Sequence, residues 1–463
     1  MVGSPTVRLH TKILLGLLLG AAVGIGANLG LGGDHPAVVA IDTYIAAPVG
    51  QVFLRMLFMV VMPLVFASIA LGVAGMGDIR KVGKVGAKAL AYFLATTALS
   101  GTVGIAAVSL FEPGKGLDPA VRAELLALYA GQAGEKVTQS QAGGFGIDTL
   151  VGIVTKNPLR SAVEGDMLGV IFFGLLFGIA LTLIDEARAR PMVDVLGALE
   201  DAMVKIVEIA MRIAPLGVAG LVFGVTARFG FALLEPLGGF VAVVLGGLAF
   251  HGLVTMSVLV VALLGLSPRT FFRRVRPSLV TAFSTSSSAA TLPTNIKVAE
   301  DDLGVPPKVA GFVLPLGATM CMNGTALFEG VTVLFLCQVF GVDLSVGQMV
   351  VVVAMTVLTA VGAAGVPGGS MPLLVGILAM FGVPGEAIAV VLGVDRILDM
   401  ARTTLNVLGD LVGAAFVARS EGAWTPADLP PLAVEPPIDQ SPDWPKEDEI
   451  VPRLSPVRPP EER

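Results

Sequence analysis

Five polar residues near the end of the chain have a spacing that could support chemistry inside a membrane. They lie 4, 3, 4 and 4 positions apart, which places them on one face of an α-helix, with Thr403 at its border: Asp395, Asp399, Arg402, Asn406 and Asp410. Apolar runs at 387–394 and 411–418 flank them, so the whole segment is long enough to cross a bilayer.

Charged side chains at bilayer depth face a cavity, a partner or an ion. Three carboxylates against one arginine leave a negative excess on this face, because Arg396 is expected to point elsewhere on the helix. The pattern therefore predicts that something cationic binds here. The alternative is a structural polar seam that joins two helices.

The composition indicates a membrane protein. Of the 463 residues, 54% are hydrophobic and 14% are charged, and the mean hydropathy is +0.84. Soluble domains carry about 25% charged residues, so we predict an all-α polytopic membrane protein. The sequence has no basic patch with interleaved aromatic residues that would indicate nucleic-acid binding. It also has no nucleophile–base pair, phosphate loop or metal cluster that would indicate an enzyme.

Apolar segments and basic clusters predict the topology. We expect a first span that is retained rather than cleaved as a signal peptide, and a last segment that holds more than one pass: 13–32, 49–75, 87–111, 167–184, 204–225, 240–266, 310–339 and 346–418. Lysine and arginine clusters near residues 8–12, 80–88 and 269–276 should be cytoplasmic. Both termini would then lie in the cytoplasm, with the protein in the cell's inner membrane. From Glu421 onward the sequence is proline-rich and predicts a disordered tail, 421–463.

Two stretches do not resemble ordinary spans. Residues 281–291 (TAFSTSSSAAT) are rich in hydroxyls between two short apolar halves, and residues 362–370 (GAAGVPGGS) separate the halves 350–361 and 371–380. Glycine and proline leave backbone groups free, which membranes tolerate only where that backbone is buried or lines a wet cavity. We therefore predict two re-entrant hairpins that enter from opposite sides, against the alternative of flexible loops or kinked helices.

A third feature lies between these stretches, in GATMCMNGTALFEG. Asn323-Gly324 is a turn signal inside an apolar helix, so we expect the helix to unwind there. Glu329 follows in an apolar setting, where burial favours a protonated carboxyl. It is a candidate proton carrier, the alternative being an interhelical hydrogen bond.

Together these motifs resemble the dicarboxylate/amino acid:cation symporter family, the glutamate transporters. The resemblance covers about residues 10–420 and rests on MLFMVVMPLVFASI, NPLRSA, SSSAATLP, LPLGAT, NGTAL, AAGVPGG and DRILDMARTTLNVLGD. It implies the glutamate-transporter fold: eight transmembrane helices and two re-entrant helical hairpins in inverted repeats, assembled as a homotrimer. Scaffold helices (about 10–75 and 150–232) would hold a mobile transport domain (about 86–111 and 236–420).

The resemblance also implies a substrate site. Arg402 would pair with the side-chain carboxylate of the substrate and Asp399 with its ammonium group. Thr325, Thr403 and Asn406 would hydrogen-bond the ligand. The two hairpin tips would wrap it with backbone groups, through Ser287 and Ser288 at the first tip and Val366 and Gly368 at the second.

The implied sodium sites use carboxylates and backbone carbonyls. One combines Asp410 with carbonyls of Gly317, Cys321 and Asn406, and another uses backbone groups at Thr319 and Ala360. A third would use Thr96 and Thr97 with Cys321 and Asn323, where the family usually has Asn and Asp. An amide in place of a carboxylate removes a charge from a buried cation site and should weaken Na⁺ binding there. Glu329 matches the proton-carrying glutamate of the mammalian members.

The expected function is secondary active symport of aspartate or glutamate with Na⁺ and/or H⁺ by an elevator movement, without an enzymatic cofactor. Having both Arg402 and Asp399 favours acidic amino acids. A C4-dicarboxylate:cation symporter stays open as an alternative, as does an uncoupled channel or receptor on the same scaffold.

Overall fold

A computed structural model describes residues 9–74, 83–117, 122–123, 154–164, 167–361 and 370–431. Within these ranges every regular element is a helix, as the sequence predicted. The helices form two groups that pack mainly within themselves.

The first group comes from the N-terminal half. It comprises α1 (Leu9–Leu31), α2 (Pro36–Ile41), α3 (Ala47–Phe58), α4 (Val61–Ala74), α8 (Pro158–Glu164), α9 (Met167–Leu183) and α10 (Glu186–Phe229). A π-helical turn, Asp42–Ala46, joins α2 to α3. The 44-residue α10 begins at the N-cap Asp185 and packs along α1, α3 and α4, while α4 also packs on α9.

Small residues allow α1 to approach α10 closely. Gly16, Gly20 and Gly24 are buried at four-residue intervals on one face of α1. A Cβ added at Gly16 or Gly20 would lie within 2.5 Å of a backbone oxygen of α10. Such stripes of small residues are a common way for membrane helices to gain van der Waals contact.

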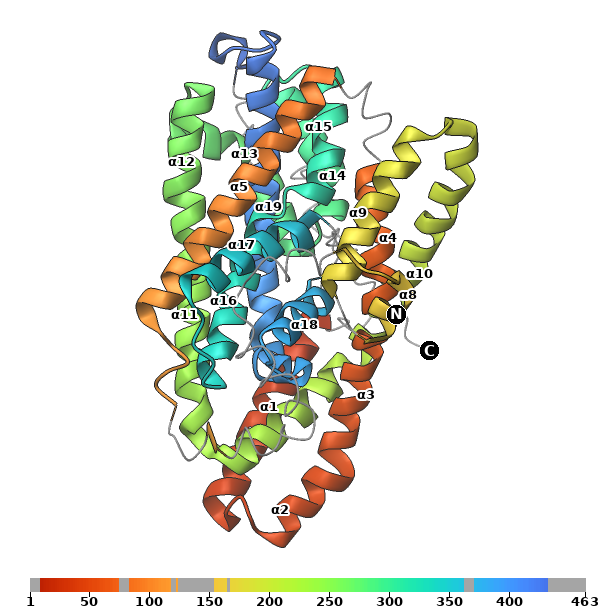
Figure 1. Ribbon diagram of the computed structural model, residues 1–463. Coiled ribbons are helices and arrows are strands. Elements are labelled where there is room, and N and C mark those ends of the chain that lie inside the picture. The colour runs from red at the N-terminus through yellow and green to blue at the C-terminus, as the bar shows by residue number, and fades with distance from the viewer. Residues whose placement is uncertain are drawn as a thin grey trace, which may run out of the picture.

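The second group contains the C-terminal half together with α5. Its helices are α5 (Gly83–Phe111), α11 (Leu234–Phe250), α12 (Met256–Leu259), α13 (Pro268–Thr285), α14 (Ser288–Lys297), α15 (Pro307–Met320), α16 (Asn323–Val339), α17 (Val346–Val361), α18 (Met371–Met380) and α19 (Ala389–Ser420). In Figure 1 the blue α19 passes through the centre of this group, and it packs against α5, α11, α13, α14, α15 and α16. The roles predicted for these groups, a scaffold for the first and a mobile transport domain for the second, stay predictions.

The described helices agree with eight crossings. Six described segments are long and apolar enough to span a bilayer: Thr11–Leu31, Pro36–Ala74, Lys84–Phe111, Glu186–Phe229, Glu235–Leu264 and Pro307–Val339. The 17-residue α9 and the 32-residue α19, which carries the charged face, complete the set.

Hairpin 1, the pair α13 and α14, reverses at Ser286. Ser286 has a left-handed backbone (φ +51°) that ends α13, and the next residue, Ser287, caps α14 by accepting a hydrogen bond from the N–H of Ala290. The hydroxyl-rich stretch is therefore a sharp tip between two helices packed against each other, as predicted for a re-entrant hairpin.

Hairpin 2 consists of α17 and α18. Its arms begin and end close to the predicted apolar halves, while its tip, including Val366 and Gly368, lies outside the described residues. In Figure 1 α14 of hairpin 1 lies above α17 and α18 of hairpin 2, and entry of the two hairpins from opposite sides of the membrane stays a prediction.

The tail expected to be disordered from Glu421 onward is ordered at its start. The Trp424 side chain is buried and donates from Nε1 to the carbonyl of Leu303 (2.7 Å). Arg274 of α13 donates to the carbonyls of Asp302 and Pro430. The prediction of disorder is therefore wrong for residues 421–431, because an indole can bury its rings and satisfy its N–H at once. Residues 432–463 lie outside the described residues.

The same segment has an ionic anchor on α5. Lys88 donates to the carbonyl and hydroxyl of Ser420 and to the Glu421 carboxylate. The hydrogen bond from Lys88 to the Glu421 carboxylate lowers the pKa of Glu421. The cytoplasmic position predicted for the tail stays a prediction.

The close packing of α1 on α10 predicts a strong position effect for one substitution. Gly20→Ala should lower the free energy of unfolding by roughly 1–3 kcal/mol, because its Cβ would meet the backbone of Ala219. Gly26→Ala, on the same helix with open space around its Cβ, should be neutral or stabilising. Thermal unfolding in detergent measures both, and equal effects would contradict the packing argument.

Candidate functional site

Arg402 is the centre of the polar face of α19. Its side chain is 1% exposed, and Nη2 lies 2.8 Å from Oδ1 of both Asp395 and Asp399. The guanidinium carbon is 3.9 Å from the centre of the Phe328 ring on α16, a cation–π contact. Two carboxylates and a ring face therefore hold this buried charge.

Part of the guanidinium remains available. Nε and Nη1 of Arg402 are buried and have no hydrogen-bond partner among the described residues. The planar fork of arginine matches a carboxylate, and buried donors without partners are costly. The arrangement can therefore bind a further anionic group.

Arg396 does not point away from the acidic face, and that prediction was wrong. Its Nη1 lies 3.6 Å from Oδ2 of Asp399, one helical turn further on, and its side chain is only 14% exposed. Between 395 and 402 two guanidiniums thus balance two carboxylates. Further buried carboxyls near this face are those of Asp410 and Glu329.

The break between α15 and α16 supplies backbone groups to this face. Cys321 and Met322 have non-helical backbones, which frees the first N–H groups of α16. The Asn406 Oδ1 accepts from the N–H of Gly324 (2.7 Å) and of Thr325 (3.4 Å). Asn406 Nδ2 in turn donates to Thr325 Oγ1 (3.3 Å). The Asn406 side chain of α19 therefore caps the first turn of α16.

The unwinding lies two residues before the predicted turn. Asn323 and Gly324 are the first residues of α16 rather than a turn. A Cβ on Gly324 would lie 2.2 Å from the carbonyl oxygen of Arg402. The glycine is therefore required for close packing of α16 on α19.

Asp410 lies about two turns after Arg402 on α19. It has the features of a cation ligand. Both of its carboxylate oxygens are buried and have no N–H or O–H partner within the described ranges. The Cys321 thiol is within hydrogen-bonding reach, and a Cβ on Gly317 would be 2.6 Å from Oδ1. A buried carboxylate beside the carbonyl-rich end of α15 can hold a hard cation such as Na⁺.

The Asn323 amide connects α5 to this region. The Thr97 hydroxyl donates to Asn323 Oδ1 (3.1 Å), and Ser100 donates to the Asn323 carbonyl (2.7 Å). The amide Nδ2 is buried without a hydrogen-bond partner in the part of the chain described. Thr96 is also buried, although its hydroxyl bonds to the carbonyl of Tyr92 within α5.

Glu329 of α16 is completely buried near Arg402. Its Oε2 accepts from the hydroxyl of Thr359 on α17 (2.6 Å), and it is close enough to Arg402 for their charges to interact. Oε1 has no hydrogen-bond partner among the described residues. A protonated carboxyl at this position could donate from that oxygen, so the group can hold or release a proton.

The remaining predicted site residues differ in their burial. Ser287 and Ser288 are buried at the tip of hairpin 1, whose α14 packs on α19. Thr403 and Ala360 are buried, whereas Thr319 is exposed and its hydroxyl bonds within α15. Val366 and Gly368 lie outside the described residues.

Several contacts of the site were not predicted from sequence. Phe328 under Arg402, Thr359 on Glu329 and Ser100 on Asn323 each lie on another helix than their partner. Met322, whose sulfur accepts from Asn406, lies in the break between α15 and α16. Their spacing along the chain carries no signal for these pairings. Only Arg396 could have been found, because an i,i+3 pair with Asp399 is visible in the sequence.

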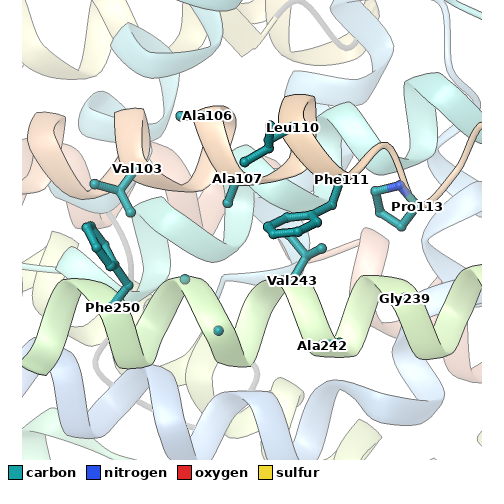
Figure 2. A pocket seen from close by; sticks show the side chains of 12 residues that line it. Val103, Ala106, Ala107, Leu110, Phe111, Pro113, Gly239, Ala242, Val243 and Phe250 are labelled. Atoms are coloured by element: carbon teal, nitrogen blue, oxygen red, sulfur yellow. The ribbon is translucent and has the colours of Figure 1, made fainter.

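A groove of about 730 Å³ lies elsewhere, between α5 and α11. Figure 2 shows its lining, which is apolar and includes Val103, Phe111, Val243 and Phe250. It offers no charged group for an ionic ligand, so the polar face of α19 is the better candidate site.

Comparison with known proteins finds relatives that match almost all of the described chain. The model of the sodium:dicarboxylate symporter family matches residues 9–420. The chain is 34% identical to the proton/glutamate-aspartate symporter of Escherichia coli over 89% of this chain and 92% of that protein.

Two proteins of Bacillus subtilis are similar to a comparable degree. Identity is 35% to its proton/sodium-glutamate symport protein, covering 90% of this chain and 94% of the relative. It is 33% to its C4-dicarboxylate transport protein, covering 82% and 88%. The matched region includes both hairpins and all of α19, and this chain therefore belongs to the sodium:dicarboxylate symporter family, a family of membrane transporters rather than enzymes.

Proposed function

We propose that this protein is a secondary active symporter that moves acidic amino acids, aspartate or glutamate, together with Na⁺ and/or H⁺. The observation that carries the proposal is the buried Arg402 guanidinium, which is held by carboxylates through one nitrogen while Nε and Nη1 have no partner among the described residues. Relatives named glutamate symporters and their 34–35% identity support it.

The substrate would bind between the hairpin tips with its charges matched. Arg402 takes the side-chain carboxylate as a bidentate partner, and Asp399 takes the ammonium. Thr325, Thr403 and Asn406 hydrogen-bond the ligand from the adjoining helices. Ser287 and Ser288 close one side, and Val366 and Gly368 of hairpin 2 close the other.

Cation coupling follows from the buried acids. Asp410, with carbonyls of Gly317, Cys321 and Asn406, binds one Na⁺, and backbone groups at Thr319 and Ala360 bind another. A closed chamber with unneutralised acids would be too costly to move through the membrane. The third site, with Thr96, Thr97, Cys321 and Asn323, is weak for Na⁺ because it lacks a carboxylate at 323.

Glu329 takes the role of a proton carrier. When protonated it is neutral next to the substrate-binding arginine, and when ionised it competes with the substrate for that arginine. Loss of the proton on the cytoplasmic side would therefore favour release of the substrate.

The wider assembly is proposed from membership of the family alone. Three copies form a homotrimer in the inner membrane, with both termini in the cytoplasm. The second helix group moves against the first as an elevator after hairpin 2 closes.

Uptake of labelled aspartate by proteoliposomes tests the function. Imposed Na⁺ or pH gradients should drive accumulation above equilibrium. Uptake indifferent to both gradients would contradict symport, and current without accumulation would identify a channel.

The charge-pairing role of Arg402 predicts a severe effect of a conservative substitution. Arg402→Lys should lower aspartate uptake by roughly 100-fold, because an ammonium cannot form the two-point contact with a carboxylate. Arg212→Lys, at an exposed position of α10, is the matched control and should leave uptake unchanged. Wild-type uptake by Arg402→Lys would remove the proposed substrate contact.

The proton-carrier role predicts a change in pH dependence. Wild-type uptake should rise as the external pH falls, because Glu329 must be protonated to load. In Glu329→Gln the amide resembles the protonated carboxyl permanently, so uptake should no longer respond to pH.

The control for this variant is Glu200→Gln. Glu200 also accepts from a hydroxyl (Ser68, 2.7 Å), but in the first helix group. It should keep the wild-type pH profile. A pH profile that survives in Glu329→Gln would assign proton coupling to another residue.

A further inference from the structure

Asp399 lies between two guanidiniums. Its Oδ1 is 2.8 Å from Nη2 of Arg402, and its Oδ2 is 3.6 Å from Nη1 of Arg396. The side chains of Asp399 and Arg396 are 11% and 14% exposed, so this second ion pair lies in a largely dry environment. Each oxygen of the carboxylate therefore has its own cation.

Binding of an amino acid would change one of these pairs. In the proposed function Arg402 turns to the side-chain carboxylate of the substrate, while the substrate ammonium replaces it at Asp399. The number of cations around Asp399 is thereby kept. A buried carboxylate that lost its cation would be strongly disfavoured.

A C4-dicarboxylate presents a different problem to the same site. It carries a second carboxylate but no ammonium, so it would draw Arg402 away from Asp399 and bring nothing in exchange. It also adds one more net negative charge than aspartate. The site could accept it only if another cation stayed on Asp399.

We propose that Arg396 is a specificity-determining residue that allows the site to bind C4-dicarboxylates in addition to acidic amino acids. It keeps Asp399 paired when the ligand lacks an ammonium and offsets the additional negative charge. This inference rests on the proposed function and extends its substrate class. The nearly equal identity to relatives named for glutamate and for C4-dicarboxylates agrees with a site of mixed character.

The geometry separates the tasks of the two arginines. Arg402 is 1% exposed, shares Nη2 between Asp395 and Asp399 and lies over Phe328, so it is the group that contacts the ligand. Arg396 precedes Asp399 by three residues on the same helix, so it can remain with that carboxylate in either complex. Arg396 acts through Asp399 and needs no contact with the ligand.

Competition against labelled aspartate in proteoliposomes tests the proposal. In the wild type, unlabelled succinate should inhibit uptake with a constant within roughly tenfold of that for unlabelled aspartate. In Arg396→Gln the constant for succinate should rise by at least about tenfold. The constant for aspartate should change much less, because its ammonium keeps Asp399 paired when the guanidinium of Arg396 is absent.

Conservative and matched variants separate this role from a structural one. Arg396→Lys keeps the charge and should restore inhibition by succinate. Arg273→Gln makes the same exchange at an exposed position of α13 and should leave both constants unchanged. If Arg396→Gln does not fold, as judged by thermal unfolding, Arg396→Met keeps the aliphatic stem and carries the same expectation.

Two outcomes would overturn the inference. One is a wild-type protein whose aspartate uptake is indifferent to succinate, and the other is a ratio of the two constants that Arg396→Gln leaves unchanged. Failure of the proposed function would look different, because the wild type would then accumulate no aspartate at all.

Discussion

The structure depends on the burial of one guanidinium in a protein surrounded by hydrocarbon. Arg402 cannot be left without partners at this depth, so Asp395, Asp399 and the Phe328 ring must be held around it. This requirement explains why α19 passes through the middle of its helix group. It also explains why the helix that faces it has glycine at 324, where the two backbones come together.

The break between α15 and α16 adds backbone hydrogen-bonding groups to the side chains of the polar face. The unwound residues Cys321 and Met322 free backbone groups next to α19, and Asn406 binds two of the resulting N–H groups. On the other side of that contact Asp410 lies beside the end of α15. The proposed anion site at Arg402 and the proposed cation site at Asp410 therefore share one helix face, about two turns apart, and neutralising one would favour occupation of the other.

Prediction from sequence succeeded where local rules decide the structure. The arms of hairpin 2 follow from apolar runs interrupted by glycine and proline, and the polar face of α19 follows from helical spacing. It failed where packing decides. Asn323-Gly324 has the local signature of a turn, yet Gly324 serves contact with Arg402, and the helix breaks earlier. Trp424 lies in a proline-rich stretch, yet finds a buried carbonyl at Leu303.

The amino-acid sequence by itself determined that this chain is a helical membrane protein with two re-entrant hairpins and one helix that carries a charged face. These properties depend on hydropathy, spacing and helix breakers, which act over a few residues. Only the tertiary structure decided which groups share that face: Phe328 under Arg402, Thr359 on Glu329 and Thr97 on Asn323. Each of these pairs joins two helices that are far apart in the chain, and no periodicity along one helix records which side chain of another will meet it.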